Sequence, residues 1–189
     1  VGCGTGANLK AFSTRCVAFG IDSSTYAIEC CWNRGLFWIA SHRALGEVLD
    51  SYHIVTILDV LEHVDNDVEM LIQARKVLVP GGILLITVPA CPWLWGPHDE
   101  ANHHKRRYTR ERLRWILKLT GFEIEKVSYF NSILFPLAIL QRFVTPNADG
   151  LRIPPFNKVL TFIFAFERFI LRWGSFPYGL SLITIARKV

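Results

Sequence analysis

Two groups of residues near the start of the chain have the types and spacing of a nucleotide-binding site. Glycines alternate in Val1-Gly2-Cys3-Gly4-Thr5-Gly6, and Asp22 follows a short apolar run further on. Glycine permits the φ values of a sharp strand-to-helix turn and lets a ligand approach bare backbone. A carboxylate at the end of the next strand can accept hydrogen bonds from both hydroxyls of a ribose. We therefore predict that Asp22 binds a ribose, although Asp22 and Ser23 could instead cap a helix.

A third group contains residue types that bind divalent metal ions. In Asp59-Val60-Leu61-Glu62-His63-Val64, a carboxylate, a second carboxylate and a histidine stand at positions i, i+3 and i+4. They lie together if a strand passes into a helical turn at this point, and oxygen and nitrogen ligands suit a hard or borderline divalent ion. The alternative is a hydrogen-bonded cluster that shapes the pocket. We favour that alternative and predict no metal.

The elements that must position these residues follow from the apolar runs. Strands are expected over 16–21, 36–40, 54–58 and 83–88, with helices over 7–12, 26–34 and 66–79 between them. Such alternation implies parallel strands with right-handed crossovers, so ligands bind beyond the carboxyl ends of the strands. Val1 is only the end of the strand that a glycine turn requires. The chain is therefore expected to lack most of its first strand.

Together these motifs resemble a known family. The glycine turn, Asp22, the 59–64 motif and Arg75-Lys76-Val77-Leu78-Val79-Pro80-Gly81-Gly82 resemble class I S-adenosylmethionine-dependent methyltransferases. Their order and spacing are similar to the ubiquinone-biosynthesis-like, type 11/12 branch of small-molecule enzymes. The resemblance runs from Val1 to about Asn131 and resumes at the last strand. It implies an α/β, Rossmann-like doubly wound sheet that is mostly parallel with an antiparallel last strand, and S-adenosylmethionine as cofactor.

The resemblance also implies a set of cofactor-binding residues. By this resemblance, Gly2, Gly4 and Gly6 border the methionine and ribose part of the cofactor. Asp22 holds the ribose hydroxyls, and Asp59 lies near the methionine amino group. Ser41 stands after the third strand where the family usually has an acidic residue, near the adenine. Some quinone O-methyltransferases similar to this chain carry a metal at the 59–63 motif. The predicted cofactor-binding residues are Gly2, Cys3, Gly4, Gly6, Asp22, Ser23, Ser41, Asp59 and Val60.

A polar and aromatic loop after the fifth strand supplies the candidates for catalysis. In related methyltransferases it reads Leu-Trp-x-x-His-Asp followed by His-x-Arg-Arg-Tyr, and it faces the acceptor. We therefore predict that His98, His104 and Tyr108 transfer a proton or orient the acceptor. Two roles stay open for Arg106 and Arg107. They could bind a phosphate or carboxylate of the acceptor, or hold the loop by pairing with acidic neighbours, namely Asp99, Glu100 and Glu111.

The last third of the chain contains an unexpected segment. Strands are predicted over 122–129 and 180–186, and residues 132–179 form an apolar helical insertion between them. Its two apolar stretches, 133–140 and 159–171, are too short or too charged to span a bilayer. Their phenylalanines and basic flanks are typical of helices that lie in a membrane interface. The alternative is a soluble lid or dimer surface over the acceptor pocket.

Composition sets the remaining limits. The chain has 189 residues, of which 51% are hydrophobic, and a net charge of +5, which is consistent with one domain over residues 1–189. The five cysteines form no disulfide framework, so we expect a cytoplasmic enzyme, either free or peripheral at a membrane surface. With no basic stripe, no nucleic-acid partner is expected. We predict a methyltransferase for a small-molecule or lipid-linked acceptor, with a non-catalytic, membrane-associated, cofactor-binding subunit as the alternative.

Overall fold

The computed structural model describes residues 1–37, 39–41, 51–144 and 157–189. The first part of the chain forms α1 (Ala7–Ser13), β1 (Gly20–Asp22), α2 (Thr25–Asn33) and β2 (Ile39–Ser41). The middle forms β3 (Tyr52–Leu58), α3 (Asp67–Val77), β4 (Leu78–Pro89), a short 3-10 helix (Pro92–Leu94), α4 (Pro97–Ala101) and α5 (Arg110–Leu119). The last part forms β5 (Phe122–Phe130), α6 (Phe135–Val144), α7 (Asn157–Trp173) and β6 (Ser181–Lys188).

The strands form two sheets. β1 and β2 pair in parallel, and a second sheet has the order β3-β4-β6-β5. In that sheet β3 and β4 are parallel, whereas β6 is antiparallel to both β4 and β5. The last strand is therefore antiparallel as predicted, and the expectation of a mostly parallel arrangement is met only for β1–β2 and β3–β4.

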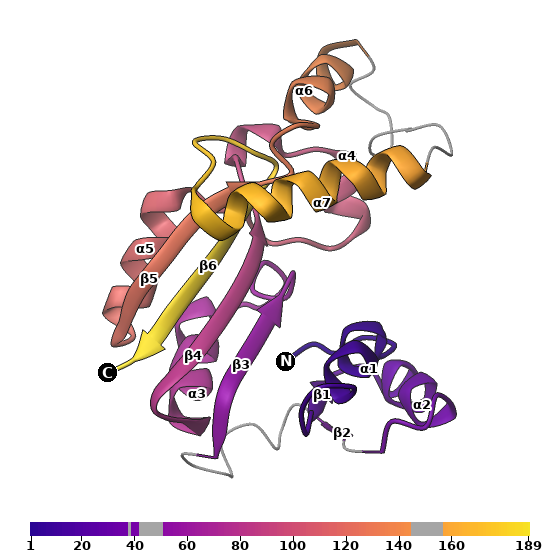
Figure 1. Ribbon diagram of the computed structural model, residues 1–189, viewed down its shortest axis with the longest axis vertical. Coiled ribbons are helices and arrows are strands. Elements are labelled where there is room, and N and C mark those ends of the chain that lie inside the picture. The colour runs from indigo at the N-terminus through magenta and orange to yellow at the C-terminus, as the bar shows by residue number, and fades with distance from the viewer. Residues whose placement is uncertain (38, 42–50, 145–156) are drawn as a thin grey trace.

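The glycine turn lies between the two sheets. The Val1 amino group donates to the Thr56 carbonyl of β3 at 2.8 Å, and the Cys3 N–H donates to the Ile21 carbonyl of β1 at 3.0 Å. Residues 1–3 thus bridge β3 and β1, and the carboxyl ends of both strands open toward the same turn. Figure 1 shows α1, α2 and the small sheet beside the edge strand β3.

Alternate residues of the central strands build the core. Leu84 and Ile86 of β4 are fully buried with Ile57 of β3, and they pack with Leu71 of α3 and Leu113 of α5. Alternation follows from the strand period of two. At the beginning of β3, Ile54 is 62% exposed because only its alternate neighbours point into the core.

Several element boundaries differ from the predicted ones. The first two strands begin later, at Gly20 and Ile39, and α3 ends at Val77, before the predicted stop at Pro80-Gly81-Gly82. That stop signal lies inside β4, next to a register shift against β3. A Cβ on Gly82 would lie 2.8 Å from the Val79 carbonyl, so the glycine permits this irregular start of the strand.

The helix caps agree with the sequence. Asn66 accepts from the Glu69 N–H at 3.0 Å at the start of α3, and Thr109 accepts from the Arg112 N–H at 3.1 Å at the start of α5. Both caps satisfy backbone donors that a helix leaves unpaired.

The segment between β5 and β6 places α7 against the sheet. Figure 1 shows α3 and α5 behind the four-stranded sheet and α7 in front of its upper end. The buried carboxylate of Glu167 on α7 accepts from the Asn131 and Ile133 N–H groups, each at 2.7 Å, and Lys126 of β5 donates to the Leu171 carbonyl. Of the helices in the described ranges, none is both long and apolar enough to cross a membrane.

Candidate active site

The glycine turn is packed too tightly for side chains. Gly2, Gly4 and Gly6 all have positive φ, at 66°, 52° and 86°. A Cβ on Gly2 would lie 2.3 Å from Cγ2 of Val60, and a Cβ on Gly6 would lie 2.8 Å from the sulfur of Cys31. Gly4 has open space where its Cβ would be. The turn therefore rests on the ends of β3 and α2 and leaves the backbone at Gly4 accessible to a ligand.

Asp22 is joined to this turn. Its Oδ2 accepts from the Gly4 N–H at 2.8 Å, and its Oδ1 accepts from the Ser24 N–H at 2.9 Å. Ser24, and not Asp22, supplies the side-chain cap of α2, by accepting from the Ala27 N–H at 3.3 Å. Ser41 is paired with Asp22 in the β1–β2 register. The structure thus brings the glycines, Asp22, its neighbour Ser23 and the backbone of Ser41 to one edge.

Cys3 adds a neutral side chain to the turn. Burial raises the pKa of its thiol to about 11, and the neighbouring Cys31 and Asp22 add to the effect. The group therefore stays protonated near neutral pH and is a weak nucleophile. Its place in the turn fits a wall of the pocket and not a reactive centre.

Asp59 is held in an unusual conformation at the end of β3. Its φ is 52°, a region that non-glycine residues rarely adopt. The Asp59 N–H donates to the carbonyl of Thr87 at 3.0 Å, and the Thr87 hydroxyl donates to Asp59 Oδ1 at 3.1 Å. Backbone strain of this kind collects at functional sites. The sequence did not single out Thr87, whose only signal was a hydroxyl inside the apolar run of β4.

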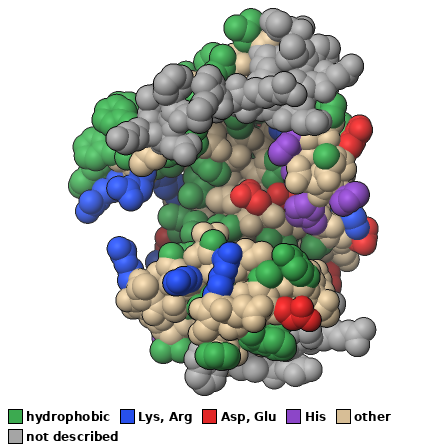
Figure 2. All heavy atoms as spheres, turned by 90° about the vertical axis from the view of Figure 1, so that its right-hand side faces the viewer, with side chains coloured by type: hydrophobic (Ala, Val, Ile, Leu, Met, Phe, Trp, Pro, Cys, Tyr) green, Lys and Arg blue, Asp and Glu red, His purple; other side chains and the backbone are tan. Residues whose placement is uncertain are grey.

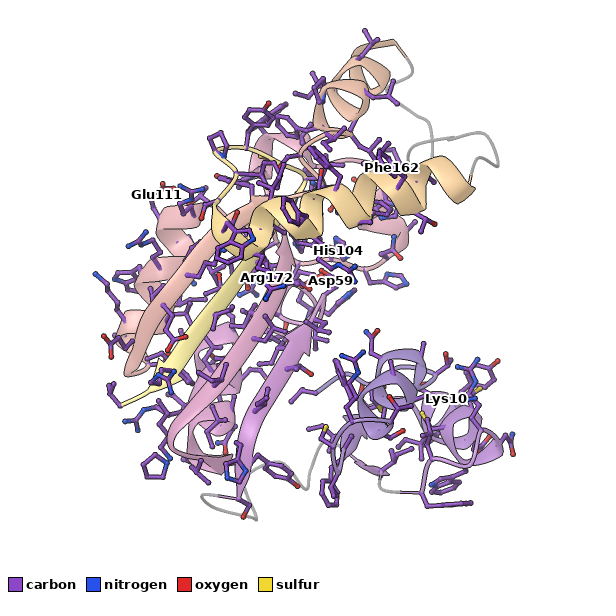
Figure 3. The ribbon with its side chains drawn as sticks, viewed as in Figure 1. Lys10, Asp59, His104, Glu111, Phe162 and Arg172 are labelled. Carbon is purple, nitrogen blue, oxygen red and sulfur yellow. The ribbon has the colours of Figure 1, made fainter. Side chains whose placement is uncertain are left out.

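A carboxylate and two histidines meet beside Asp59. Glu62 is only 1% exposed, and its Oε2 has no hydrogen-bond partner among the residues that the structure describes. Burial raises the pKa of Glu62 to about 7, with Asp59 adding to the effect. The rings of His63 and His104 meet edge to face at 4.8 Å, and His98 lies 6.3 Å from His104. Figure 2 shows acidic and histidine side chains beside one another in a hollow, and Figure 3 shows Asp59 and His104 near the upper ends of β3 and β4.

Asp99 fixes the orientation of His104. The carboxylate is fully buried and accepts from His104 Nδ1 at 2.9 Å, from Arg107 Nε at 2.7 Å and from the Gly96 N–H at 3.0 Å. Burial opposes its ionisation, but the hydrogen bonds from Arg107 and His104 outweigh that effect and hold the pKa of Asp99 below its ordinary value. The anionic Asp99 therefore keeps the other ring nitrogen of His104, Nε2, turned away from this contact.

Tyr108 is placed differently from the expected role. The side chain is fully buried, and its hydroxyl lies 3.2 Å from the Leu61 carbonyl and 3.1 Å from Asp67 Oδ2. Burial raises the pKa of Tyr108 far above its ordinary value, with Asp67 adding to the effect. This environment opposes proton transfer to an acceptor, and we assign Tyr108 to the core beneath the loop.

The two arginines hold the loop. Arg107 pairs with Asp99 and also donates to the Ala90 carbonyl at 3.1 Å. Arg106 pairs with Asp67 at 3.3 Å and donates to the Val64 carbonyl at 3.0 Å. Of the two open roles, loop stabilisation is the one that these contacts support. Asp67 takes the place that the sequence assigned to Glu100 and Glu111.

An aromatic wall lies next to this loop. Trp93 contacts Phe135 with ring centroids 6.3 Å apart, and Phe135 contacts Tyr178 at 5.6 Å. The three rings come from the loop after β4, from α6 and from the segment before β6. The insertion thus adds apolar surface to the loop after β4.

Comparison with known proteins agrees with this geometry. A family model described as a methyltransferase domain matches residues 1–127. A S-adenosylmethionine-dependent methyltransferase from Archaeoglobus fulgidus has a similar structure, with a TM-score of 0.64 at 19% identity over 99% of this chain and 83% of that chain. A second S-adenosylmethionine-dependent methyltransferase, from Mesorhizobium loti, has a TM-score of 0.64 at 16% identity, over 99% of this chain and 88% of that chain.

Another similar structure contains the cofactor. It is phosphoethanolamine N-methyltransferase 2 of Haemonchus contortus in complex with S-adenosyl-L-methionine, with a TM-score of 0.62 at 17% identity over 99% of this chain and 47% of that chain. A search of curated proteins found no match. The chain belongs to the methyltransferase domain family, and it shares the Rossmann-like α/β fold of these S-adenosylmethionine-dependent methyltransferases.

Proposed function

We propose that the protein transfers the methyl group of S-adenosylmethionine to a small-molecule acceptor that carries a lipid-like part. The observation that supports this most strongly is the meeting of two groups at one edge of the fold. The glycine turn and Asp22 lie at the ends of β1 and β3, and the His63–His104 pair lies beside Asp59 at the end of β3. A cofactor on one group would present its methyl toward the other.

The cofactor side follows from the contacts of the turn. Asp22 already accepts two backbone hydrogen bonds, and a carboxylate has lone pairs left for the ribose hydroxyls. Asp59, fixed by Thr87, is exposed and available for the methionine amino group. The further residues that we assign to the cofactor pocket are Gly2, Cys3, Gly4, Gly6, Ser23, Ser41 and Val60.

The acceptor side needs alignment and a route for a proton. Methyl transfer from a sulfonium requires acceptor, methyl and sulfur in line. An oxygen or nitrogen acceptor also loses a proton, which a positioned histidine can take. Asp99 engages Nδ1 of His104, and within the described residues no hydrogen bond is found at Nε2. We assign proton transfer or acceptor orientation to His104, with His98 as its neighbour.

The exposed apolar face of α7 supports a lipid-like acceptor. Phe162, Phe166, Phe169 and Trp173 follow the i, i+4, i+7, i+11 spacing of one helix face, and all four are exposed, Phe162 at 73% and Trp173 at 77%. We call this set the α7 stripe. Figure 3 shows Phe162 and Arg172 at different points along α7. A large exposed apolar patch marks an interaction site.

Charge favours an anionic membrane as the partner of the α7 stripe. Arg168 and Arg172 are exposed on the same helix, and the whole chain carries a net charge of +5. A basic, apolar helix of this kind lies in the interface of anionic lipids. A protein at that surface can receive a lipid-linked acceptor without extracting it into water.

The test is transfer of labelled methyl into lipid. Purified protein with labelled S-adenosylmethionine is incubated with a total lipid extract or with a water-soluble metabolite extract. We expect label in the lipid fraction, reduced about a hundredfold or more by His104→Ala and unchanged by His53→Ala, an exposed histidine of β3. Label in the water-soluble fraction alone would overturn the lipid-like acceptor, and no transfer to either extract would contradict the proposal.

A further inference from the structure

Two thiols meet behind the glycine turn. Cys3 lies in the turn and Cys31 lies on α2, and a hydrogen bond joins their side chains. Cys31 is fully buried, and its Sγ also donates to the Gly4 carbonyl at 3.2 Å. Cys3 is partly exposed, and both cysteines are free. The fold thus brings together two cysteines that are far apart in the sequence.

Two glycines make room for these sulfur atoms. A Cβ on Gly6 would lie 2.8 Å from Sγ of Cys31, and a Cβ on Gly20 would lie 3.0 Å from Sγ of Cys3. A side chain at either position would crowd the sulfur atom beside it. The packing of the turn, β1 and α2 therefore holds the two thiols against each other.

The other three cysteines have different neighbours. Cys30 precedes Cys31 on α2, but its thiol has a hydrogen bond with Tyr26, a side chain that is 70% exposed. Cys16 is exposed and donates to a carbonyl of its own segment at 3.4 Å. Cys91 lies in the loop after β4. Proximity therefore favours Cys3 as the partner of Cys31.

We propose that Cys3 and Cys31 form a reversible disulfide when the protein meets a low-molecular-weight disulfide such as oxidised glutathione. In the first step, the Cys3 thiolate attacks one glutathione sulfur, and the other glutathione leaves and takes up the proton that Cys3 has lost. In the second step, the Cys31 sulfur attacks the Cys3 sulfur, and its proton passes to the glutathione that leaves. Two protein thiols are thus oxidised to one disulfide, and oxidised glutathione is reduced to two molecules of glutathione.

The exposure of the two thiols sets the order of these steps. Cys3 is partly exposed in a turn with open space at Gly4, whereas Cys31 is 0% exposed. The oxidant therefore reaches Cys3 first, and Cys31 resolves the mixed disulfide from the protein interior. Burial raises the pKa of Cys3 to about 11, so only a small thiolate fraction reacts and the exchange is slow near neutral pH.

A disulfide at this place would change the turn that the cofactor approaches. The two sulfur atoms must come to about 2 Å from each other, which pulls Cys3 and Cys31 together. Cys31 also loses its S–H, so the Gly4 carbonyl loses that donor. The Gly4 N–H donates to Asp22 at 2.8 Å, so a shift of Gly4 disturbs the carboxylate that we assign to the ribose. This effect on the cofactor rests on the proposed function, whereas the disulfide itself does not.

The first test is disulfide mapping of the full chain. The protein is equilibrated in glutathione buffers from reducing to oxidising, alkylated, digested and sequenced by mass spectrometry. We expect one internal disulfide, between Cys3 and Cys31, in the folded protein and no preference for this pair in urea. Cys3→Ser and Cys31→Ser should abolish it, whereas the matched controls Cys16→Ser and Cys30→Ser should keep it.

Three outcomes would overturn the disulfide. These are no internal disulfide at any glutathione ratio, a disulfide that contains Cys30 in place of Cys31, and the same linkage pattern in folded and urea-unfolded protein. Circular dichroism shows whether each serine variant has folded. Mapping of the unmodified chain decides the question for any variant that has not.

The second test compares the S-adenosylmethionine affinity of the reduced and oxidised protein by calorimetry. We expect oxidation to weaken binding about fivefold or more, and dithiothreitol to restore it. By thermodynamic linkage, saturating cofactor must shift the glutathione equilibrium toward the two thiols by the same factor. Equal affinities would overturn the effect on the cofactor, while mapping still decides the disulfide. No binding by the reduced, unmodified chain would count against the proposed function.

Discussion

On the proposed acceptor side of the site, Asp99 is a single residue that holds several others in place. Asp99 links three residues of the loop after β4, because its carboxylate accepts hydrogen bonds from Gly96, His104 and Arg107. Its residue type was visible in the sequence, where it was assigned to loop pairing. The sequence did not show that Asp99 also orients His104, because the five-residue spacing between the two residues fixes no contact until the loop is folded.

Replacing the Asp99 carboxylate tests both its contribution to the stability of the fold and its role in orienting His104. Asp99→Asn removes the charge that Arg107 and His104 share, and we expect the free energy of unfolding to fall by about 3 kcal/mol. Methyl transfer should fall about tenfold to a hundredfold. The control is Asp65→Asn, an exposed partner of Lys105, which should change the unfolding free energy much less, because solvent screens an exposed ion pair. Equal effects in the two variants, measured by urea unfolding, would contradict this role of Asp99.

Glu62 gives the protein a predicted pH dependence. Its pKa is raised from the model-peptide value of 4.5 to about 7 in the folded state, so the folded protein binds more protons than the unfolded chain between these values. Stability should therefore fall as the pH rises through this window, by about 3 kcal/mol from this group alone.

Urea unfolding in the presence of a chelator tests this pH dependence. Between about pH 5 and about pH 8, the unmodified chain should lose more stability than Glu62→Gln does, because glutamine does not titrate. The opposite order, or equal slopes, would show that Glu62 ionises normally in the folded protein.

Among the secondary-structure elements, the glycine turn and the caps were the most predictable. Each is specified by a few adjacent residues, as in the glycine turn or in Asn66 and Thr109. The start of β4 was less predictable. Pro80 and Gly81 have the composition of a helix stop, but long-range pairing with β3 makes them part of a strand. The burial of Tyr108 against Asp67 is likewise a tertiary property that a sequence motif does not contain.

Two glycines allow a matched test of the turn. Gly2 and Gly35 have similar positive φ values, 66° and 75°, but only a Cβ on Gly2 meets another residue, at 2.3 Å from Val60. Gly35→Ala should cost about 1 kcal/mol of stability for the left-handed backbone alone. Gly2→Ala should cost about 1 to 3 kcal/mol more from overpacking and should weaken S-adenosylmethionine binding. Thermal unfolding with calorimetric titration measures both, and equal costs would contradict the tight packing of the turn.

The whole molecule combines the proposed cofactor edge with a basic, apolar surface on α7. α7 is fixed to β5 and its loop by Glu167 and Lys126, so the α7 stripe has a defined position relative to the sheet. The sequence predicted the apolar insertion 132–179 from composition. It could not show which residues face outward, because α7 has apolar residues around much of its circumference and packing alone selects the exposed ones.

Vesicle sedimentation tests this surface. Phosphatidylcholine vesicles with phosphatidylserine should pellet the protein, and vesicles without it should pellet less, because the basic residues add attraction to anionic lipids. Phe166→Ser with Phe169→Ser should abolish sedimentation, whereas Phe37→Ser, which removes an exposed phenylalanine outside the stripe, should not. Sedimentation that is equal in all three proteins, or absent in the unmodified chain, would exclude the α7 stripe as a membrane surface.

The central claim is that the glycine turn and Asp22 form the S-adenosylmethionine pocket. Calorimetric titration of the protein with S-adenosylmethionine and S-adenosylhomocysteine tests it most directly, alongside Asp22→Ala and the control Glu29→Ala, an exposed acid on α2. We expect micromolar binding of both nucleotides, lost in Asp22→Ala and kept in Glu29→Ala. Binding that is absent in the unmodified chain, or that persists unchanged in Asp22→Ala, would contradict it.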